Sequence, residues 1–192
     1  MLTVSQELYE YWLKLKRERP VPDRNEVEPG AIRGILADTF ILDIGGASGL
    51  RFRISGSRAN ALFLRELRGS SFLHLWRLSD RAPVEAILQR AADLARPRAL
   101  HAEARPTGLA NLAIEMILLP LRHRGPGCSR MLGAVAVETL PPWHGLIGAG
   151  EIALTSDCPP DTAPGAADSS SDSGGLASPS ATHIGRHWVT RP

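Results

Sequence analysis

The chain has 192 residues, a formal net charge of +2 and 43% hydrophobic residues, while aromatic residues make up only 5%. This length fits one domain of ordinary size with short appendages, and the hydrophobic content is enough for a core built mainly from aliphatic side chains. The small basic surplus forms no concentrated stripe, so we expect no nucleic-acid partner.

The amino-terminal segment MLTVSQELYEYW has neither the basic start nor the continuous apolar run of a signal peptide. No run approaches the roughly 20 apolar residues of a membrane span. We therefore expect a cytoplasmic protein without a membrane partner.

Residues 1–20 are predicted to form an amphipathic helix. Leu8, Trp12 and Leu15 recur at spacings of four and three, which places them on one stripe of such a helix, and Pro20 ends it. A surface helix would leave this stripe exposed to water. We expect the stripe either to cover a sheet or to mediate self-association, and a homodimer is the expected assembly.

Residues 21–155 are predicted to form the folded domain. Alternating apolar and polar residues predict five strands, at 39–44, 50–56, 98–105, 111–121 and 130–139. Helical patterns occupy 57–64, 70–76 and 80–96, with Asp80 as a fitting N-cap for the last of these. Strands that follow one another without alternating helices favour an α+β fold, an antiparallel sheet with helices on one face.

Residues 156–192 are predicted to form an unstructured tail. Up to residue 182 this segment consists almost entirely of Ser, Asp, Pro, Gly and Ala, which offer too little apolar surface to offset the entropy of ordering a chain. The last ten residues regain Ile184, Trp188 and Val189, and could be a docking peptide or a frayed terminus.

Several ordered segments of this sequence resemble a bacterial family of stand-alone PAS-like domains. They include the Leu8-Tyr9-x-Tyr11-Trp12 opening, FRISGS at 52–57, RELRG at 65–69 and the pair Leu75-Trp76. The resemblance implies a PAS-type fold whose five strands have the spatial order 2-1-5-4-3. It also implies a sensory or regulatory role in bacterial signalling, with a small molecule or a signalling protein as partner and no catalytic output of its own.

The sequence offers no convincing catalytic site. The turn Gly56-Ser57-Arg58-Ala59-Asn60 lacks the second glycine of the hydrolase nucleophile elbow, and no group of residues has the spacing of metal ligands. We therefore expect a protein that is not an enzyme. The alternatives are a small α+β enzyme that uses the same pocket, or a ligand-free adaptor.

His74 and His101 are the histidines that would be considered as haem ligands. A lone histidine in an apolar segment is more often structural, because metal ligation needs supporting hydrogen-bond partners. The sequence therefore supports neither haem nor flavin, and the cofactor, if any, is left unassigned.

The predicted elements enclose an apolar chamber between sheet and helices. Arg58 would be the one fixed charge near it, and a small organic anion would be its ligand, since binding sites are mostly apolar with a few placed polar groups. The alternative is a fully packed core without a ligand. The candidate ligand-binding residues are Phe52, Arg58, Phe63, Phe72, His74, Trp76, Ile114 and Met116.

Overall fold

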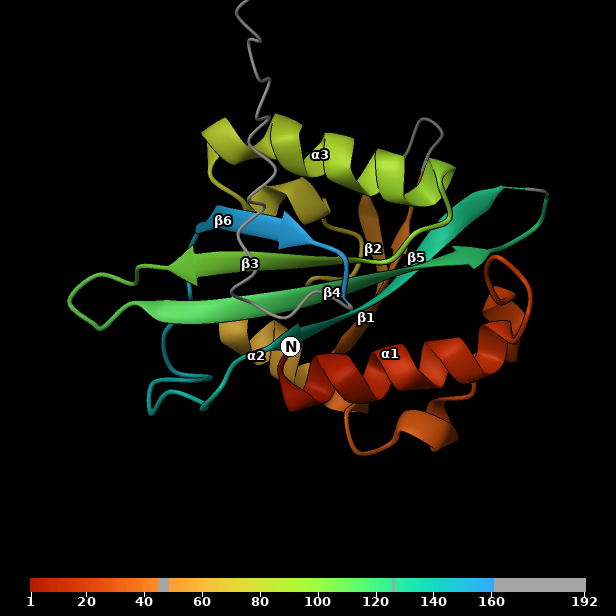
Figure 1. Ribbon diagram of the computed structural model, residues 1–192. Helices are drawn as coiled ribbons and strands as arrows, with labels where there is room; N and C mark the ends of the chain where they lie inside the picture. Colours follow the sequence, from red (N-terminus) through yellow and green to blue (C-terminus); the bar gives the residue numbers. More distant parts are fainter. Residues whose placement is uncertain (45–48, 126, 161–192) are drawn as a thin grey trace, which may run out of the picture.

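The computed structural model describes residues 1–44, 49–125 and 127–160. Its centre is a six-stranded antiparallel sheet with the order β2-β1-β5-β4-β3-β6 (Figure 1). The strands are β1 Thr39–Asp43, β2 Arg51–Ser55, β3 Arg98–Ala104, β4 Leu112–Arg122, β5 Cys128–Ala136 and β6 Ile152–Cys158. The predicted order 2-1-5-4-3 and the α+β class are confirmed, and β6 is added beside β3.

The α-helices are α1 Thr3–Lys16, α2 Ser57–Phe63 and α3 Leu78–Asp93. Short 3-10 helices lie at η1 Arg24–Glu26, η2 Pro29–Ile32, η3 Leu36–Asp38 and η4 Phe72–Leu75. Helices α1 and α3 lie on opposite sides of the sheet (Figure 1). No helix within the described ranges is both long and apolar enough to cross a membrane.

Two apolar clusters cover the two faces of the sheet. On the first, which we call the aromatic face, α2, η4 and α3 pack over strand residues that include Phe40, Phe52 and Met116. On the second, the α1 face, α1 and the segment after it pack over residues that include Ile117 and Leu119. Because β4 contributes alternate side chains to both clusters, it reads in sequence as an almost unbroken apolar run.

Helix α1 uses its apolar stripe within its own chain. Leu8 and Trp12 are 0% and 1% exposed, and the Trp12 Nε1–H group donates a hydrogen bond to the Pro120 carbonyl oxygen at 2.9 Å. Leu15 is partly buried at the edge of the same cluster. Of the two predicted roles, the structure shows the helix covering the sheet, so self-association has no exposed Leu8 or Trp12 to act through.

Strand β6 was not among the expected strands. It pairs with β3 from Ala104↔Ile152 to Ala99↔Cys158, so regular structure continues three residues past position 155. This edge strand is mostly solvent-accessible, so its sequence shows little alternation of apolar and polar residues. Backbone hydrogen bonds to β3 hold it in the sheet. Residues 161–192, which include most of the predicted unstructured tail and the segment 183–192, lie outside the described residues.

Asp80 differs from its predicted role. Helix α3 begins two residues earlier than position 80, so Asp80 lies in its first turn and is not the N-cap. Its Oδ2 atom accepts a hydrogen bond from the Leu154 backbone N–H at 3.0 Å. A residue with the chemistry of a helix cap therefore anchors β6 to α3.

Candidate functional site

The predicted apolar chamber exists as a group of neighbouring side chains, and they fill it. Six of the predicted site residues belong to the cluster on the aromatic face and are at most 6% exposed: Phe52, Phe63, Phe72, Trp76, Ile114 and Met116. The Phe72 ring lies 5.7 Å from the Phe52 ring and 5.9 Å from the Trp76 ring, measured between centroids. These are contact distances for aromatic pairs. The rings of the chain itself therefore occupy the space between the sheet and η4.

Trp76 leaves one polar group of this chamber without a partner. The side chain is 0% exposed, and its buried Nε1 atom forms no hydrogen bond with any described residue. A buried donor without an acceptor costs roughly 1–3 kcal/mol. Among the predicted site residues, Trp76 is thus the one whose surroundings leave a hydrogen-bonding capacity unused.

His74 lies outside the chamber, although it is one of the candidate residues. In η4 the side chains at positions i and i+3 share a face, and Phe72 and Leu75 take the inward positions, each 0% exposed. His74 is left exposed, and its backbone carbonyl oxygen accepts a hydrogen bond from Arg65 Nη2 at 3.2 Å. The structure therefore places His74, a candidate ligand-binding residue, on the exposed side of η4.

Arg58 forms an ion pair with the Asp38 carboxylate. Its Nε and Nη2 atoms lie 2.7 and 2.5 Å from the two Asp38 carboxyl oxygens, a bidentate pair. The hydrogen bond to Asp38 raises the pKa of the Arg58 guanidinium. Because Asp38 already balances this charge, Arg58 is less available to an organic anion than the sequence suggested.

Arg58 also borders a small surface cavity separate from the chamber. The cavity measures about 230 Å³ and lies between α2, the end of β5 and the segment 137–144. Apolar side chains such as Leu62 and Leu140 form much of its wall, and His144 Nε2 lies 3.2 Å from the Arg58 carbonyl oxygen. Asp38 and His144 are the members that sequence reasoning missed. Neither belongs to a motif, so no local signal pointed to them.

A second missed feature is an apolar surface patch beside α2, here called the α2 patch. Its members are Leu64, Leu140, Leu146 and Ile147, which are 53%, 51%, 76% and 43% exposed. The hydrogen bond from the Ala149 N–H to the Leu62 carbonyl oxygen, at 2.8 Å, holds the second half of the patch against α2. A Leu-Ile pair between the glycines of the segment 143–150 was the available sequence signal, because glycine-rich loops run mostly over the protein surface.

Comparison with known proteins identifies the family. A family model described as a PAS domain matches residues 2–136, which is more than half of the chain and extends from α1 to the end of β5. Strand β6 and the segment that leads to it lie beyond this match. No curated protein matches the chain. From the strand order and the family match together, the chain belongs to the PAS domain family.

Proposed function

We propose that this PAS domain is a regulatory module that acts by binding a signalling protein through the α2 patch and carries out no catalytic step itself. The observation that carries the proposal is the filled chamber on the aromatic face. Phe52, Phe72 and Trp76 are at most 1% exposed and their rings are in contact. A domain whose interior is occupied by its own side chains communicates through its surface.

The α2 patch has the composition of a protein-binding surface. Single exposed apolar residues are common on soluble proteins, whereas neighbouring ones mark interaction sites. Leu146 is 76% exposed and lies next to Ile147, and the adjoining Gly148 approaches Leu64 closely. The apolar cavity that Leu140 borders continues the patch inward. A partner with an apolar contact residue would therefore find both a surface and a depression to fill.

The backbone at Leu64 supports a role for its side chain. Leu64 ends α2 in the left-handed region, with φ 49° and ψ 40°. Glycine favours this position, and a side chain there costs on the order of 1–2 kcal/mol. Since the Leu64 side chain is half exposed, it recovers little of that cost by burial. An exposed apolar side chain at such a position supports contact with a partner.

Site-specific photo-crosslinking in cells tests the proposal. A photoreactive residue replaces Leu146 in one variant and Leu78 in a matched control, because Leu78 is 78% exposed but lies on α3 away from the patch. We expect a protein adduct that forms from position 146, is absent from position 78, and binds directly when both proteins are purified. Equal crosslinking from both positions, or no adduct, contradicts the proposal.

The strain at Leu64 provides a second variant. Leu64→Gly removes the side chain and suits the backbone, so the free energy of unfolding is expected to stay equal or to rise by about 1 kcal/mol. Binding of the purified partner is expected to weaken. A variant that is as stable as the parent but binds the partner equally well would remove Leu64 from the patch.

A second candidate function, recognition of a small molecule in the chamber, is favoured by Trp76 alone. A ligand with a hydrogen-bond acceptor would satisfy the buried Nε1–H group. Native mass spectrometry of the protein purified from its own host tests this: a copurified molecule that is lost in Trp76→Phe supports the sensor. A spectrum with the mass of the polypeptide alone supports the surface module.

A further inference from the structure

Five arginines from separate parts of the chain line one pocket, which we call the arginine pocket. It measures about 510 Å³ and lies where η1, β2, the β4–β5 hairpin and the loop before η4 meet. Within the described residues it has no acidic side chain in its wall. The arginines are Arg24, Arg53, Arg68, Arg124 and Arg130.

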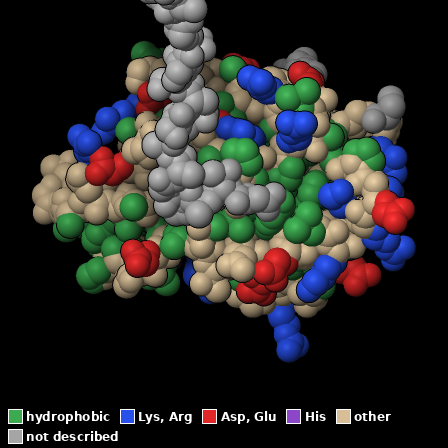
Figure 2. All heavy atoms as spheres, in the orientation of Figure 1, with side chains coloured by type: hydrophobic (Ala, Val, Ile, Leu, Met, Phe, Trp, Pro, Cys, Tyr) green, Lys and Arg blue, Asp and Glu red, His purple; other side chains and the backbone are tan. Residues whose placement is uncertain are grey.

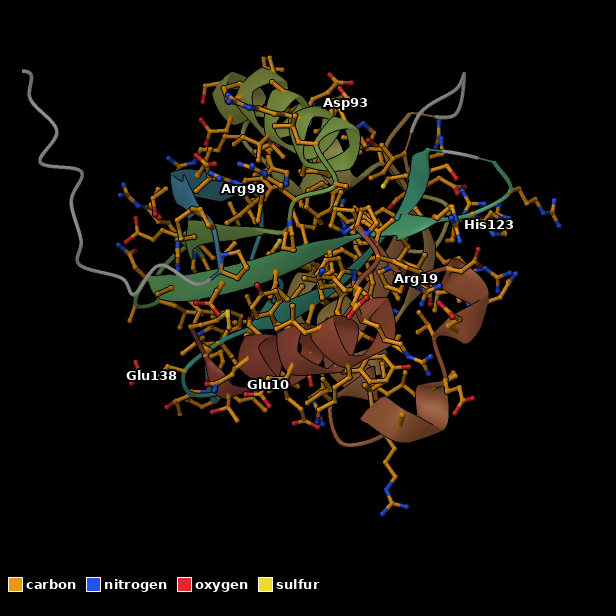
Figure 3. The ribbon with its side chains drawn as sticks, turned by 45° about the vertical axis from the view of Figure 1, so that its right-hand side comes forward. Glu10, Arg19, Asp93, Arg98, His123 and Glu138 are labelled. Atoms are coloured by element: carbon orange, nitrogen blue, oxygen red, sulfur yellow. The ribbon has the colours of Figure 1, made fainter. Side chains whose placement is uncertain are left out.

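One residue of the pocket wall can be located at one end of the molecule. Figure 3 shows His123, another residue of the pocket wall, at the tip of the β4–β5 hairpin. In Figure 2, Lys and Arg side chains gather at the corresponding right-hand edge, with a few acidic side chains between them. The arginine pocket lies over β1 and β2 on the α1 face. Helix α1 packs on β4 and β5 of the same face, so the pocket lies beyond the helix.

The positive charge of the arginine pocket exceeds what the nearby carboxylates balance. Asp43 serves two of the arginines, since it pairs with Arg130 and lies 3.3 Å from Arg53 Nε. In the part of the chain that the structure describes, the other three, Arg24, Arg68 and Arg124, form no ion pair. This contrasts with Arg58, whose guanidinium has a carboxylate to itself.

Other acidic residues on the segments that border the pocket are engaged elsewhere, such as Glu26, which pairs with Arg19. Asp23 lies 3.6 Å from Arg122 Nε, outside the set of five. Glu66 accepts hydrogen bonds from the backbone N–H of Arg68, from Ser55 and from Asn60, and these bonds together with the positive charge of Arg68 lower the pKa of its carboxyl group. Asp23 pairs outside the set of five and Glu66 is shared among several donors, so these two carboxylates offset only part of the positive charge of the pocket.

Crowding of like charge is visible at Arg130. Its side chain is 19% exposed, and burial, together with the positive charge of Arg24, lowers the pKa of its guanidinium. Cations held near one another in a partly buried site favour an anion that neutralises them.

We propose that the arginine pocket binds a small organic phosphate carrying two or more negative charges. Guanidinium groups match phosphate oxygens in pairs of parallel hydrogen bonds, and three arginines without ion pairs suit a ligand of more than one charge. Ile41, Phe52 and Ile54 also line the pocket, and Ile54, which is 51% exposed, supplies most of the apolar wall for the organic part of the ligand. The volume lies in the usual range for small-molecule sites.

The shape of the site distinguishes this ligand from a nucleic acid. A nucleic-acid surface is a stripe that follows many phosphates, whereas these arginines surround one bounded depression. The inference adds an input site to the proposed regulatory module and does not depend on the α2 patch, which lies over α2 and the segment 140–147.

Isothermal titration calorimetry at constant ionic strength tests the site, with inorganic pyrophosphate and adenosine diphosphate as probes. The test variant is the double substitution Arg24→Ala, Arg124→Ala, which removes two charges that form no ion pair among the described residues, so the fold is expected to persist by circular dichroism. The matched control is Arg90→Ala, an exposed arginine on α3 at the other side of the sheet.

We expect saturable binding of both probes to the parent chain and a loss of about 10-fold or more in affinity in the double variant, with no change in Arg90→Ala. Absence of saturable binding overturns the proposal. An equal loss in Arg90→Ala shows nonspecific attraction to the net charge and overturns it as well. A short oligothymidine that displaces pyrophosphate and binds more tightly than adenosine diphosphate would show a nucleic-acid surface instead.

Discussion

Trp12 on the α1 face and Trp76 on the aromatic face are both at most 1% exposed, and their indole N–H groups differ in their hydrogen bonding. On the α1 face Trp12 donates to the Pro120 carbonyl oxygen at 2.9 Å. On the aromatic face the Trp76 Nε1 atom is equally buried and has no acceptor among the described residues. A satisfied group stabilises the fold, whereas an unsatisfied one costs free energy and is the better candidate for a functional contact. Burial alone would have treated the two residues alike.

The largest expected loss of stability comes from a substitution that disrupts the packing on the aromatic face. Phe72→Ala removes a ring that contacts Phe40, Phe52 and Trp76. We expect the free energy of unfolding to fall by about 4 kcal/mol, because the cavity adds to the lost transfer energy. Urea denaturation followed by circular dichroism measures the change. Leu78→Ala, at a position 78% exposed, should change it by less than about 0.5 kcal/mol. A loss below about 1 kcal/mol for Phe72→Ala would mean that this face is loosely packed.

A smaller effect is expected where the same face has no room for a side chain. A Cβ atom on Gly133 would lie 2.3 Å from Phe40 Cζ and 2.8 Å from the Ile117 carbonyl oxygen. Gly133→Ala should therefore displace the Phe40 ring and cost about 1–3 kcal/mol of unfolding free energy. The control is Gly127→Ala, because nothing lies within 4 Å of that position. Equal stabilities of the two variants would show that Phe40 moves aside freely.

The matched substitutions Trp12→Phe and Trp76→Phe compare the hydrogen-bonded indole N–H group with the one that has no acceptor. Both substitutions remove the same atoms from a buried site, so the cavity cost is similar. Only Trp12→Phe also breaks a hydrogen bond, and we expect it to lower the free energy of unfolding by about 1 kcal/mol more than Trp76→Phe. Thermal and urea denaturation of both variants measure the difference. The reverse order would show that the Trp76 N–H group finds an acceptor in solution.

The smallest expected effect is a pH dependence of the folding stability that Glu26, in the segment after α1, contributes. Hydrogen bonds from Arg19 and from the Asp23 backbone N–H lower the pKa of Glu26 below its ordinary value of 4.5. A carboxyl group whose pKa is lower in the folded than in the unfolded protein stabilises the fold at pH values above its unfolded-state pKa. This stabilisation disappears as the pH falls through its folded-state pKa. Glu26→Gln should therefore be less stable than the parent at neutral pH.

Melting temperatures measured from neutral pH down to about pH 3 follow this difference, which is expected to shrink in acid. High salt should reduce it at neutral pH, because the pair of Glu26 with Arg19 is exposed and screened. A difference that persists unchanged in acid would assign the effect to packing and not to charge.

Much of the fold could be predicted because the relevant signals are local. Alternation along residues 98–104 is contained in the residues themselves, and so is the stripe of Leu8, Trp12 and Leu15. Side chains two apart in a strand, or three and four apart in a helix, share a face whatever the rest of the chain does. The strand order came from the family resemblance, which records the outcome of packing in related chains.

The candidate site was only partly predictable. Six apolar residues of the expected chamber do meet, since hydrophobic burial gathers such side chains in any compact arrangement. The orientation of His74 depended on the phase of a short 3-10 helix, which one residue of shift would have reversed. The environment of Arg58 depended on Asp38, twenty residues earlier in the chain.

The sequence by itself determined where β1 to β5 and the α-helices form and which of their faces are apolar, because those properties depend on neighbours a few residues apart. Only the tertiary structure decided that β6 pairs with β3, that Asp38 neutralises Arg58, and that Arg24 and Arg130 line the same pocket. The physical reason is that the reach of a charge or a hydrogen bond is a few ångströms in space. Which residues come within that reach is settled when distant segments fold together.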